Sequence, residues 1–196
     1  MDGVFDSTWR ARCAVSEVSQ TVLNPLIGQH YLQKPPAVSR CCLLMTCDIW
    51  NVGMVVFADA PLQTSVRYGG VTWELARLWI DDNMPRNAES WLIGKALRHV
   101  NRTYADVQFI VSYADPSAGH VGTIYKASNW EFDGMTQDGR NTPRCDLVSK
   151  DGKKYSRAAH VPEGEIVMRV PRVSKTRFVY RLQRTRKQAT ANEAVR

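Results

Sequence analysis

The sequence lacks the features that mark disulfide-bonded, zinc-binding and membrane-spanning proteins. Its five cysteines are an odd number and include no Cys-x-x-Cys pair, which argues against a disulfide framework and a structural zinc site. No stretch of about 18 residues is continuously apolar, so no transmembrane helix is expected. The N-terminus lacks the basic and then apolar order of a signal peptide. We therefore expect a protein of a reducing cytoplasm.

Acidic residues are absent from one long segment near the C-terminus. The chain has a net charge of +7, and this segment holds only basic charges: Arg169, Arg172, Lys175, Arg177, Arg181, Arg184, Arg186 and Lys187. Such a segment is typical of proteins that bind a polyanion, of which nucleic acid is the commonest. The alternative is a solvated tail that only aids solubility.

Internal repeats are also absent, and a hydrophobic content of 44% suits one main core in 196 residues. Short apolar runs predict a set of strands, over 41–47, 54–58, 71–80, 107–111, 165–170 and 176–182. An apolar stripe predicts a helix that Asn87 caps and that continues to Val100. The polar runs 61–70 and 134–156 are expected to be loops. This order predicts an α+β fold, with a central mixed, mostly antiparallel sheet flanked by helices.

The segment SYADPSAGHVGTIYKASNW predicts a strand, a turn and a helix. The strand ends at Asp115, before a proline, and Ser117 is expected to cap the helix. A carboxylate at the end of a central strand lies where open α/β sheets place ligand sites. Gly119 and Gly122 would each cost a helix about 1 kcal/mol, which indicates that another group approaches the backbone. The alternative is a plain strand-turn-helix with small residues for packing.

The runs HYLQKPP, ELARLWIDDNMPRNAESWLIGKALR and VSYADPSAGHVGTIYKASNW resemble the Mom family of bacteriophage DNA-modification proteins, over roughly residues 24–182. Members are divergent relatives of the GNAT acyltransferases and add a carbamoylmethyl group to the exocyclic amine of adenine, which protects phage DNA from restriction. The resemblance implies a single GNAT-like domain over residues 1–182, followed by a basic, flexible tail over residues 183–196.

The same resemblance implies a catalytic centre made of four residues: His30, Tyr31, Asp115 and Tyr125. In the family this set is proposed to surround a metal ion, and one imidazole, one carboxylate and phenolic oxygens suit iron better than a thiolate-seeking metal. Taken singly, each residue also has a plain structural interpretation. His30 could be a loop histidine, and Tyr125 a core aromatic with a solvated hydroxyl.

The group donor is where the sequence departs from the GNAT pattern. GNAT enzymes hold the CoA pyrophosphate with a glycine-rich loop at the start of their first core helix. Here the helix start reads MPRNAES, without Gly-x-Gly. Arg86, Asn87 and Ser90 are the candidate phosphate contacts, and Glu89 would oppose them. An acyl-CoA-type donor is thus implied by the resemblance, while a capped helix without a ligand is the alternative.

The leading hypothesis is a phage or prophage transferase that modifies adenine in double-stranded DNA within the host cytoplasm. Base flipping would be required, for which Trp9, Trp50 and Trp130 are candidate stacking surfaces. Glu74, Ser117 and His120 are candidates for proton transfer. DNA contacts are expected from Arg177, Arg181, Arg184, Arg186 and Lys187. The alternatives are a catalytically inactive DNA-binding accessory protein and an ordinary N-acetyltransferase; the sequence does not indicate an oligomeric state.

Overall fold

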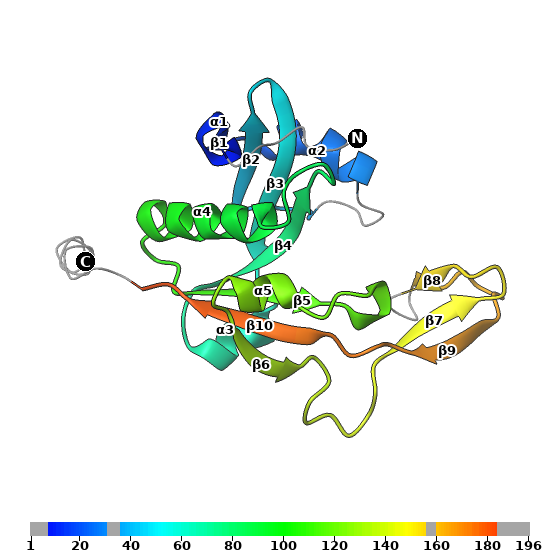
Figure 1. The fold of residues 1–196 in the computed structure, drawn as a ribbon. Helices are drawn as coiled ribbons and strands as arrows, with labels where there is room; N and C mark the ends of the chain where they lie inside the picture. Colours follow the sequence, from blue (N-terminus) through cyan, green and yellow to red (C-terminus); the bar gives the residue numbers. More distant parts are fainter. Residues whose placement is uncertain (1–7, 31–35, 156–159, 184–196) are drawn as a thin grey trace. The chain divides into compact units, whose positions relative to one another are not determined.

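The computed structural model describes residues 8–30, 36–155 and 160–183 (Figure 1). The helices are α1 (Trp9–Arg12), α2 (Gln20–His30), α3 (Leu62–Tyr68), α4 (Ala88–Thr103) and α5 (Thr123–Ala127), with a 3-10 helix, η1 (Pro116–Ala118). The strands are β1 (Cys13–Glu17), β2 (Cys41–Cys47), β3 (Trp50–Asp59), β4 (Thr72–Ile80), β5 (Phe109–Ala114), β6 (Glu131–Met135), β7 (Cys145–Ser149), β8 (Lys154–Tyr155), β9 (Val167–Pro171) and β10 (Thr176–Arg181).

Seven strands form one mixed sheet in the order β1-β2-β3-β4-β5-β10-β6, and three form a small antiparallel sheet in the order β8-β7-β9. Strands β1 to β4 pair antiparallel, whereas β4 and β5 pair parallel. Helix α4 makes the crossover between these parallel strands, as parallel pairing requires. The sheet therefore has the mixed, mostly antiparallel character that the sequence predicts.

Chain contacts divide the protein into two compact units. The first unit comprises the described residues of Met1–Ser112, Thr123–Glu131 and Phe178–Arg196. The second comprises those of Tyr113–Gly122 and Phe132–Arg177. The first unit holds β1 to β4 and the five α-helices, and the second holds η1 and the small sheet.

The core of the first unit lies on both faces of β2, which is almost entirely buried, and of the central part of β3. On one face, Met54 packs with Leu23 and Ile27 of α2. Because side chains alternate along a strand, Gly53 faces the other way. A Cβ atom at Gly53 would lie 3.2 Å from the Leu92 side chain of α4. The two helices thus cover opposite faces, and glycine lets α4 pack closely on the sheet.

The parallel pairing of β4 and β5 is short, and this shapes the centre of the sheet. Residues Thr72–Glu74 pair with Phe109–Val111, and no register continues beyond Glu74 although β4 runs on to Ile80. The pairing of β4 with β3 also shifts beside Ala76, which forms a bulge. The two parallel strands therefore part after Glu74, and polar groups of the strands become available at this junction.

Helix α4 agrees with its apolar stripe, since Leu92, Ile93, Ala96, Leu97 and Val100 are all buried. Asn87 is its N-cap residue, as predicted, but the Asn87 side chain makes no capping hydrogen bond. The expected loop at 61–70 instead contains α3, which ends at Gly69 in the left-handed conformation. Among the described residues no helix is long and apolar enough to cross a membrane.

The second unit departs most from the sequence-based expectation. One helix was expected after Asp115, but η1 ends at Gly119 and α5 begins only at Thr123. Gly119 and Gly122 have φ angles of 77° and 80°, which interrupt a right-handed helix. The expected loop at 134–156 contains β7 and β8. These strands carry little apolar periodicity because much of their surface is exposed or half-exposed.

Candidate active site

The junction of β4 and β5 holds a buried pair of hydroxyl groups in the first unit. The Ser112 hydroxyl on β5 lies 2.8 Å from the Tyr125 hydroxyl on α5 and 3.1 Å from the carbonyl oxygen of Leu75 on β4. That carbonyl lies just beyond the last paired residue of β4, so Ser112 replaces a missing ladder bond. Ser112 thereby fixes the Tyr125 hydroxyl at the point where the strands part.

Aromatic packing holds the Tyr125 ring in place. It stacks on the Phe178 ring and packs against the Trp130 ring, with 5.2 Å between ring centroids in each case. Only 8% of Tyr125 is exposed. Burial raises the pKa of the Tyr125 hydroxyl, Ser112 lowers it in part, and the carboxylates of Glu74 and Glu89 raise it further. Tyr125 is therefore protonated at neutral pH and suited to donate a proton.

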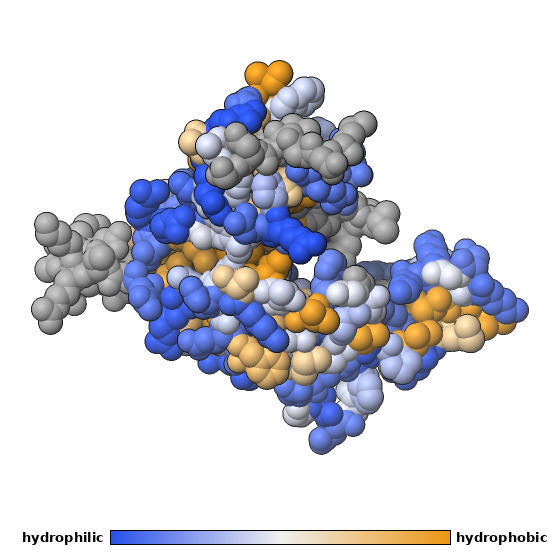
Figure 2. All heavy atoms as spheres, viewed as in Figure 1, coloured by the Kyte–Doolittle hydropathy of each residue, from blue (hydrophilic) through white to orange (hydrophobic). Residues whose placement is uncertain are grey.

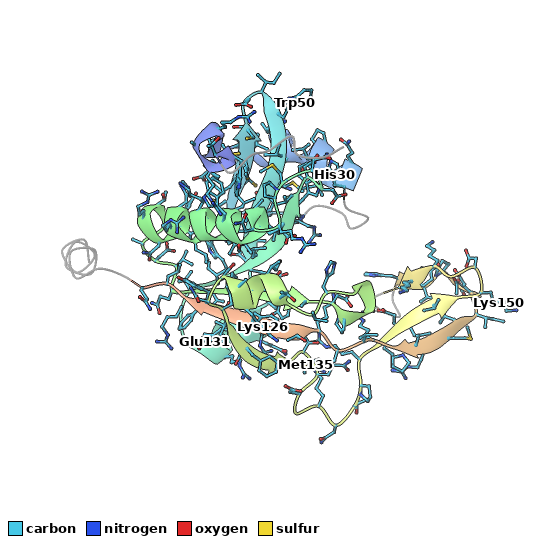
Figure 3. All side chains as sticks on the ribbon, viewed as in Figure 1. His30, Trp50, Lys126, Glu131, Met135 and Lys150 are labelled. Atoms are coloured by element: carbon cyan, nitrogen blue, oxygen red, sulfur yellow. The ribbon has the colours of Figure 1, made fainter. Side chains whose placement is uncertain are left out.

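His30 is the last residue of α2 and also belongs to the first unit (Figure 3). Its ring stacks on Trp79 of β4, with 4.0 Å between ring centroids. His30 is exposed at the end of the helix. Its predicted partner Tyr31 lies outside the described residues.

Asp115 belongs to the second unit, where it caps η1. One carboxylate oxygen accepts hydrogen bonds from the Ser117 hydroxyl and from the Ser117 backbone N–H at 3.0 Å. The other lies 3.0 Å from the Lys175 ammonium. The Ser117 hydroxyl, and then Lys175, lower the pKa of Asp115 against the opposing effect of burial. Asp115 is thus a carboxylate at neutral pH, and its assembly with His30, Tyr31 and Tyr125 stays a prediction.

A cleft of about 400 Å³ opens in the first unit between α4, α5 and the end of β10. Ser90, Arg98 and Asn101 line it from α4, and Ser128 and Asn129 line it from the turn after α5. Ser90 is one of the three residues predicted to bind the donor, and Arg86 and Asn87 precede it at the exposed start of the helix. The cleft thus combines one guanidinium with several hydroxyl and amide groups, which suits a polar or phosphorylated ligand.

The residues predicted to bind DNA have different surroundings. The Arg177 guanidinium bonds to the carboxylate of Asp133 at 2.6 Å, and its side chain is only 12% exposed. Arg181 is exposed and places its guanidinium over the Phe109 ring at 5.0 Å. The other three residues, Arg184, Arg186 and Lys187, lie outside the described part of the chain. Arg181 is therefore the more accessible of the two that are described.

The candidate stacking tryptophans also differ. Trp9 and Trp130 are buried, at 2% and 5% exposed, and belong to the core. Trp50 is 66% exposed where β3 begins and remains accessible to a partner.

The described contacts of Asp115 give the predicted metal centre no support, and the centre stays a prediction. The Lys175 ammonium holds one oxygen of Asp115, where a metal cation would have to bind. One group of three His, Cys or acidic side chains is compact enough for a metal among the residues described: Glu17, Cys41 and His99. However, the Glu17 carboxylate already bonds to His99 at 2.6 Å and to the Tyr104 hydroxyl. Burial also raises the pKa of the Cys41 thiol to about 12, so it is not a thiolate.

Ser112 is not among the site residues predicted from the sequence, although a signal for it exists. A single hydroxyl in the apolar run FIVSYA has to find a hydrogen-bond partner when the strand is buried. That requirement indicates a polar contact but does not identify Tyr125 as the partner. The lining of the cleft from α5 was also missed, because α5 was expected to begin earlier in the chain.

Comparisons with known proteins agree with this architecture. The ribosomal-protein-S18-alanine N-acetyltransferase of Escherichia coli has a TM-score of 0.52, with 8% identity over 88% of this chain and 96% of that chain. The structure of yncA from Salmonella typhimurium with its cofactor acetyl-CoA also has a TM-score of 0.52, with 9% identity over 89% of this chain and 96% of that chain. Identities this low show the fold alone, and the fold is GNAT-like, as predicted.

Sequence comparison is more specific. Over 61 residues the chain is 44% identical to the methylcarbamoylase mom of Escherichia phage Mu, a match that covers 31% of this chain. The matched region spans only 25% of the length of the phage Mu protein. A model of the Mom protein family matches residues 12–195, nearly the whole sequence. The chain therefore belongs to the Mom protein family.

Proposed function

We propose that this protein is a phage or prophage transferase that adds a carbamoylmethyl group to the exocyclic amine of adenine in duplex DNA. The observation that carries the proposal is the 44% identity to the phage Mu methylcarbamoylase, together with the family match over residues 12–195. The adenine amine is a hydrogen-bond donor in the major groove. A substituent there blocks the contacts by which restriction enzymes read adenine, which protects the DNA.

The reaction requires the amine to leave the base stack. Enzymes that act on a base inside a duplex flip the nucleotide out, at a cost of a few kcal/mol. In this proposal the reacting amine enters the junction of β4 and β5, next to Tyr125. The host cytoplasm, where phage DNA replicates, is the proposed place of action.

Each step of the transfer has a candidate group on this chain. The amine nitrogen forms a bond to the methylene carbon of the donor group, and the bond from that carbon to its leaving group breaks. Tyr125, protonated and buried, gives its proton to the leaving group. Glu74, on β4 where the strands part, is the candidate acceptor of the proton from the amine.

Asp115 has a different proposed role because its pKa is lowered. A carboxylate of low pKa is a weak proton acceptor at neutral pH but a strong hydrogen-bond acceptor. We assign it to binding and orienting the amine, with His30 and Tyr31 as the other residues of the centre. Iron is not used in this scheme, since Lys175 holds the Asp115 carboxylate.

The cleft between α4 and α5 is the proposed site of a donor that carries a CoA-type phosphorylated portion and has its leaving group on the methylene carbon. Arg98, Ser90 and the amide side chains of the cleft would hold its polar portion, with Arg86 and Asn87 at the helix start near a phosphate. A solved structure of the same fold, yncA, holds acetyl-CoA, which supports a donor of this type. Acetyl-CoA itself would give an acetylated amine, because a thioester reacts at its carbonyl carbon. The mass of the adduct therefore reports the donor chemistry.

Mass spectrometry of nucleosides from a bacterium expressing the protein tests the proposal. We expect deoxyadenosine bearing a carbamoylmethyl group, and resistance of that DNA to restriction enzymes that read adenine. Variants His30→Ala and Asp115→Asn should abolish the adduct while the melting temperature stays within a few degrees, since neither side chain fills the core. Tyr68→Phe, in α3, is the matched control. Only unmodified deoxyadenosine in DNA from cells with soluble wild-type protein would overturn the proposal.

A second candidate function is N-acetylation of a small molecule or protein, which the acetyltransferase fold favours. Turnover of acetyl-CoA in the absence of DNA, with no adduct on DNA, would select it. DNA binding with neither activity would select a catalytically inactive accessory protein.

A further inference from the structure

The small sheet β8-β7-β9 of the second unit has one open face. Met168 on β9 pairs with Val148 on β7, so both side chains lie on this face, and Val170 and Ile166 share it by alternation along the chain. Ile166, Met168 and Val170 are 67%, 62% and 43% exposed. The opposite face carries Tyr155, which is only 6% exposed. Figure 2 shows apolar residues of this sheet in orange among polar ones.

The small sheet and its turns carry more exposed basic side chains than exposed acidic ones. Three of the acidic side chains of the strands and their turns have an internal partner: Asp146 bonds to Arg172 at 2.5 Å, Asp151 to the Ser149 hydroxyl, and Glu165 accepts from the Tyr155 hydroxyl at 2.8 Å, whereas Glu163 is exposed in the turn before β9. Four exposed cations have no side-chain partner among the described residues: Arg144, Lys150, Lys154 and Arg169. The net surface offered to a partner is therefore cationic.

The positions of two lysines relate these charges to the open face. Lys154 on β8 pairs with Val148, so Lys154, Val148 and Met168 cross the three strands on one face. Lys150 stands on the turn that joins β7 to β8 (Figure 3). An exposed apolar row flanked by free ammonium groups matches the needs of duplex DNA. Cations bind phosphates, and methionine or isoleucine side chains can enter between base steps.

We propose that the open face of the small sheet is a DNA-binding surface, with Lys150 and Lys154 on phosphates and Met168 against the bases. The inference rests on the proposed function, in which the substrate is duplex DNA and a base must leave the stack. Insertion of an apolar side chain lowers the cost of unstacking, so Met168 would assist that step. Asp115 of the candidate centre belongs to the same compact unit as this surface.

The charge contribution can be tested by fluorescence anisotropy with the full-length protein and a labelled DNA duplex over a range of salt concentrations. The double variant Lys150→Gln/Lys154→Gln should bind at least about ten-fold more weakly at physiological salt. Its slope of log affinity against log salt should flatten by roughly 1.8, or about 0.9 for each phosphate that a lysine no longer neutralises. Lys95→Gln/Arg102→Gln, which removes the same charge from exposed positions on α4, is the matched control and should keep the wild-type slope.

The apolar contribution needs a different variant. Met168→Ser should leave the salt slope unchanged, because the substitution removes no charge. It should weaken binding to a fully paired duplex more than binding to one with a mismatched adenine, since a mismatched base is already partly unstacked. Equal weakening for both duplexes would remove Met168 from the proposal.

The lysine result decides the surface as a whole. A double variant that matches the wild type in affinity and slope overturns the proposal and points to a protein partner for the open face. Failure of the proposed function has a different signature. Loss of binding in the lysine variant, combined with unmodified adenine in cells expressing wild type, keeps the DNA surface and rejects the chemistry. Modified adenine with no dependence on these lysines keeps the chemistry and rejects the surface.

Discussion

The centre of the large sheet and the small sheet are built from strands of opposite exposure. Six of the seven residues of β2 are buried, whereas four of the five residues of β9 are exposed. Burial of apolar surface supplies most of the stability of a domain, at about 25 cal/mol per Å². The large sheet is therefore the stable scaffold that positions Tyr125. The small sheet contributes little apolar burial.

The largest expected effect is on the rate of adenine modification and comes from Tyr125 in the first unit, because its proposed role is to donate a proton in the reaction. Tyr125→Phe keeps the ring stacked on Phe178 but removes the proton, so the rate of adenine modification should fall by about 10²–10⁴-fold. Ser112 keeps its hydrogen bond to the Leu75 carbonyl in this variant, so stability should fall by only about 0.5–1.5 kcal/mol, the net contribution of one hydrogen bond. Single-turnover assays with purified DNA measure the rate. A Tyr125→Phe enzyme of wild-type rate would remove Tyr125 from the proton transfer.

The second largest effect should be the difference in unfolding free energy between a core variant in β2 and a surface variant in β9. Leu43→Ala, at a fully buried position in β2, should lower the free energy of unfolding by about 2–5 kcal/mol through reduced burial and a residual cavity. Met168→Ala, at a position 62% exposed in β9, should change it by less than about 0.5 kcal/mol. Urea titration followed by circular dichroism gives both values. A decrease at Met168 equal to that at Leu43 would mean that the open face is covered by another part of the protein or by a second copy.

How well the sequence predicts each region follows the same contrast. Strand β2 and helix α4 were predicted because burial forces apolar residues into the period of each element. Strands β7 and β8 were missed because exposed strands need no such period. Helix α3 was missed for a related reason, since the segment LQTSVRY is short and buries only Thr64. Apolar periodicity thus predicts buried strands and helices better than exposed ones.

The candidate site was predictable only in part. The family resemblance predicts functional roles for Tyr125 and Asp115, and these roles stay predictions. It did not reveal that Ser112 bonds to Tyr125 or that Lys175 holds Asp115, because both contacts join residues that lie far apart in the sequence. Such contacts depend on which strands are neighbours, and a local pattern does not determine them.

The smallest expected effect is the pH dependence that the Asp115 contact with Lys175 gives to stability. The pKa of Asp115 in the folded protein is lowered from its ordinary value of 3.8, first by the hydrogen bond from the Ser117 hydroxyl and then by Lys175. The contact should therefore stabilise the fold at every pH above that ordinary value. This contribution should disappear as pH falls through the lowered pKa, because the folded carboxylate then takes up a proton. Since the Lys175 side chain is 39% exposed, solvent screens the pair and the effect is small.

Melting temperatures of wild type and Asp115→Asn, measured from pH 2 to pH 8, test this sign. The two curves should be separated by a small constant amount at neutral pH and should converge at the acidic end, where the wild-type carboxylate is also neutral. Asp82→Asn, at an exposed position in the turn before α4, serves as the control and should follow the wild type throughout. A wild type that melts below Asp115→Asn at neutral pH, with the difference closing toward acidic pH, would require the opposite shift. Asp115 would then be held with a raised pKa and suited to act as the proton acceptor, and Glu74 would lose that role.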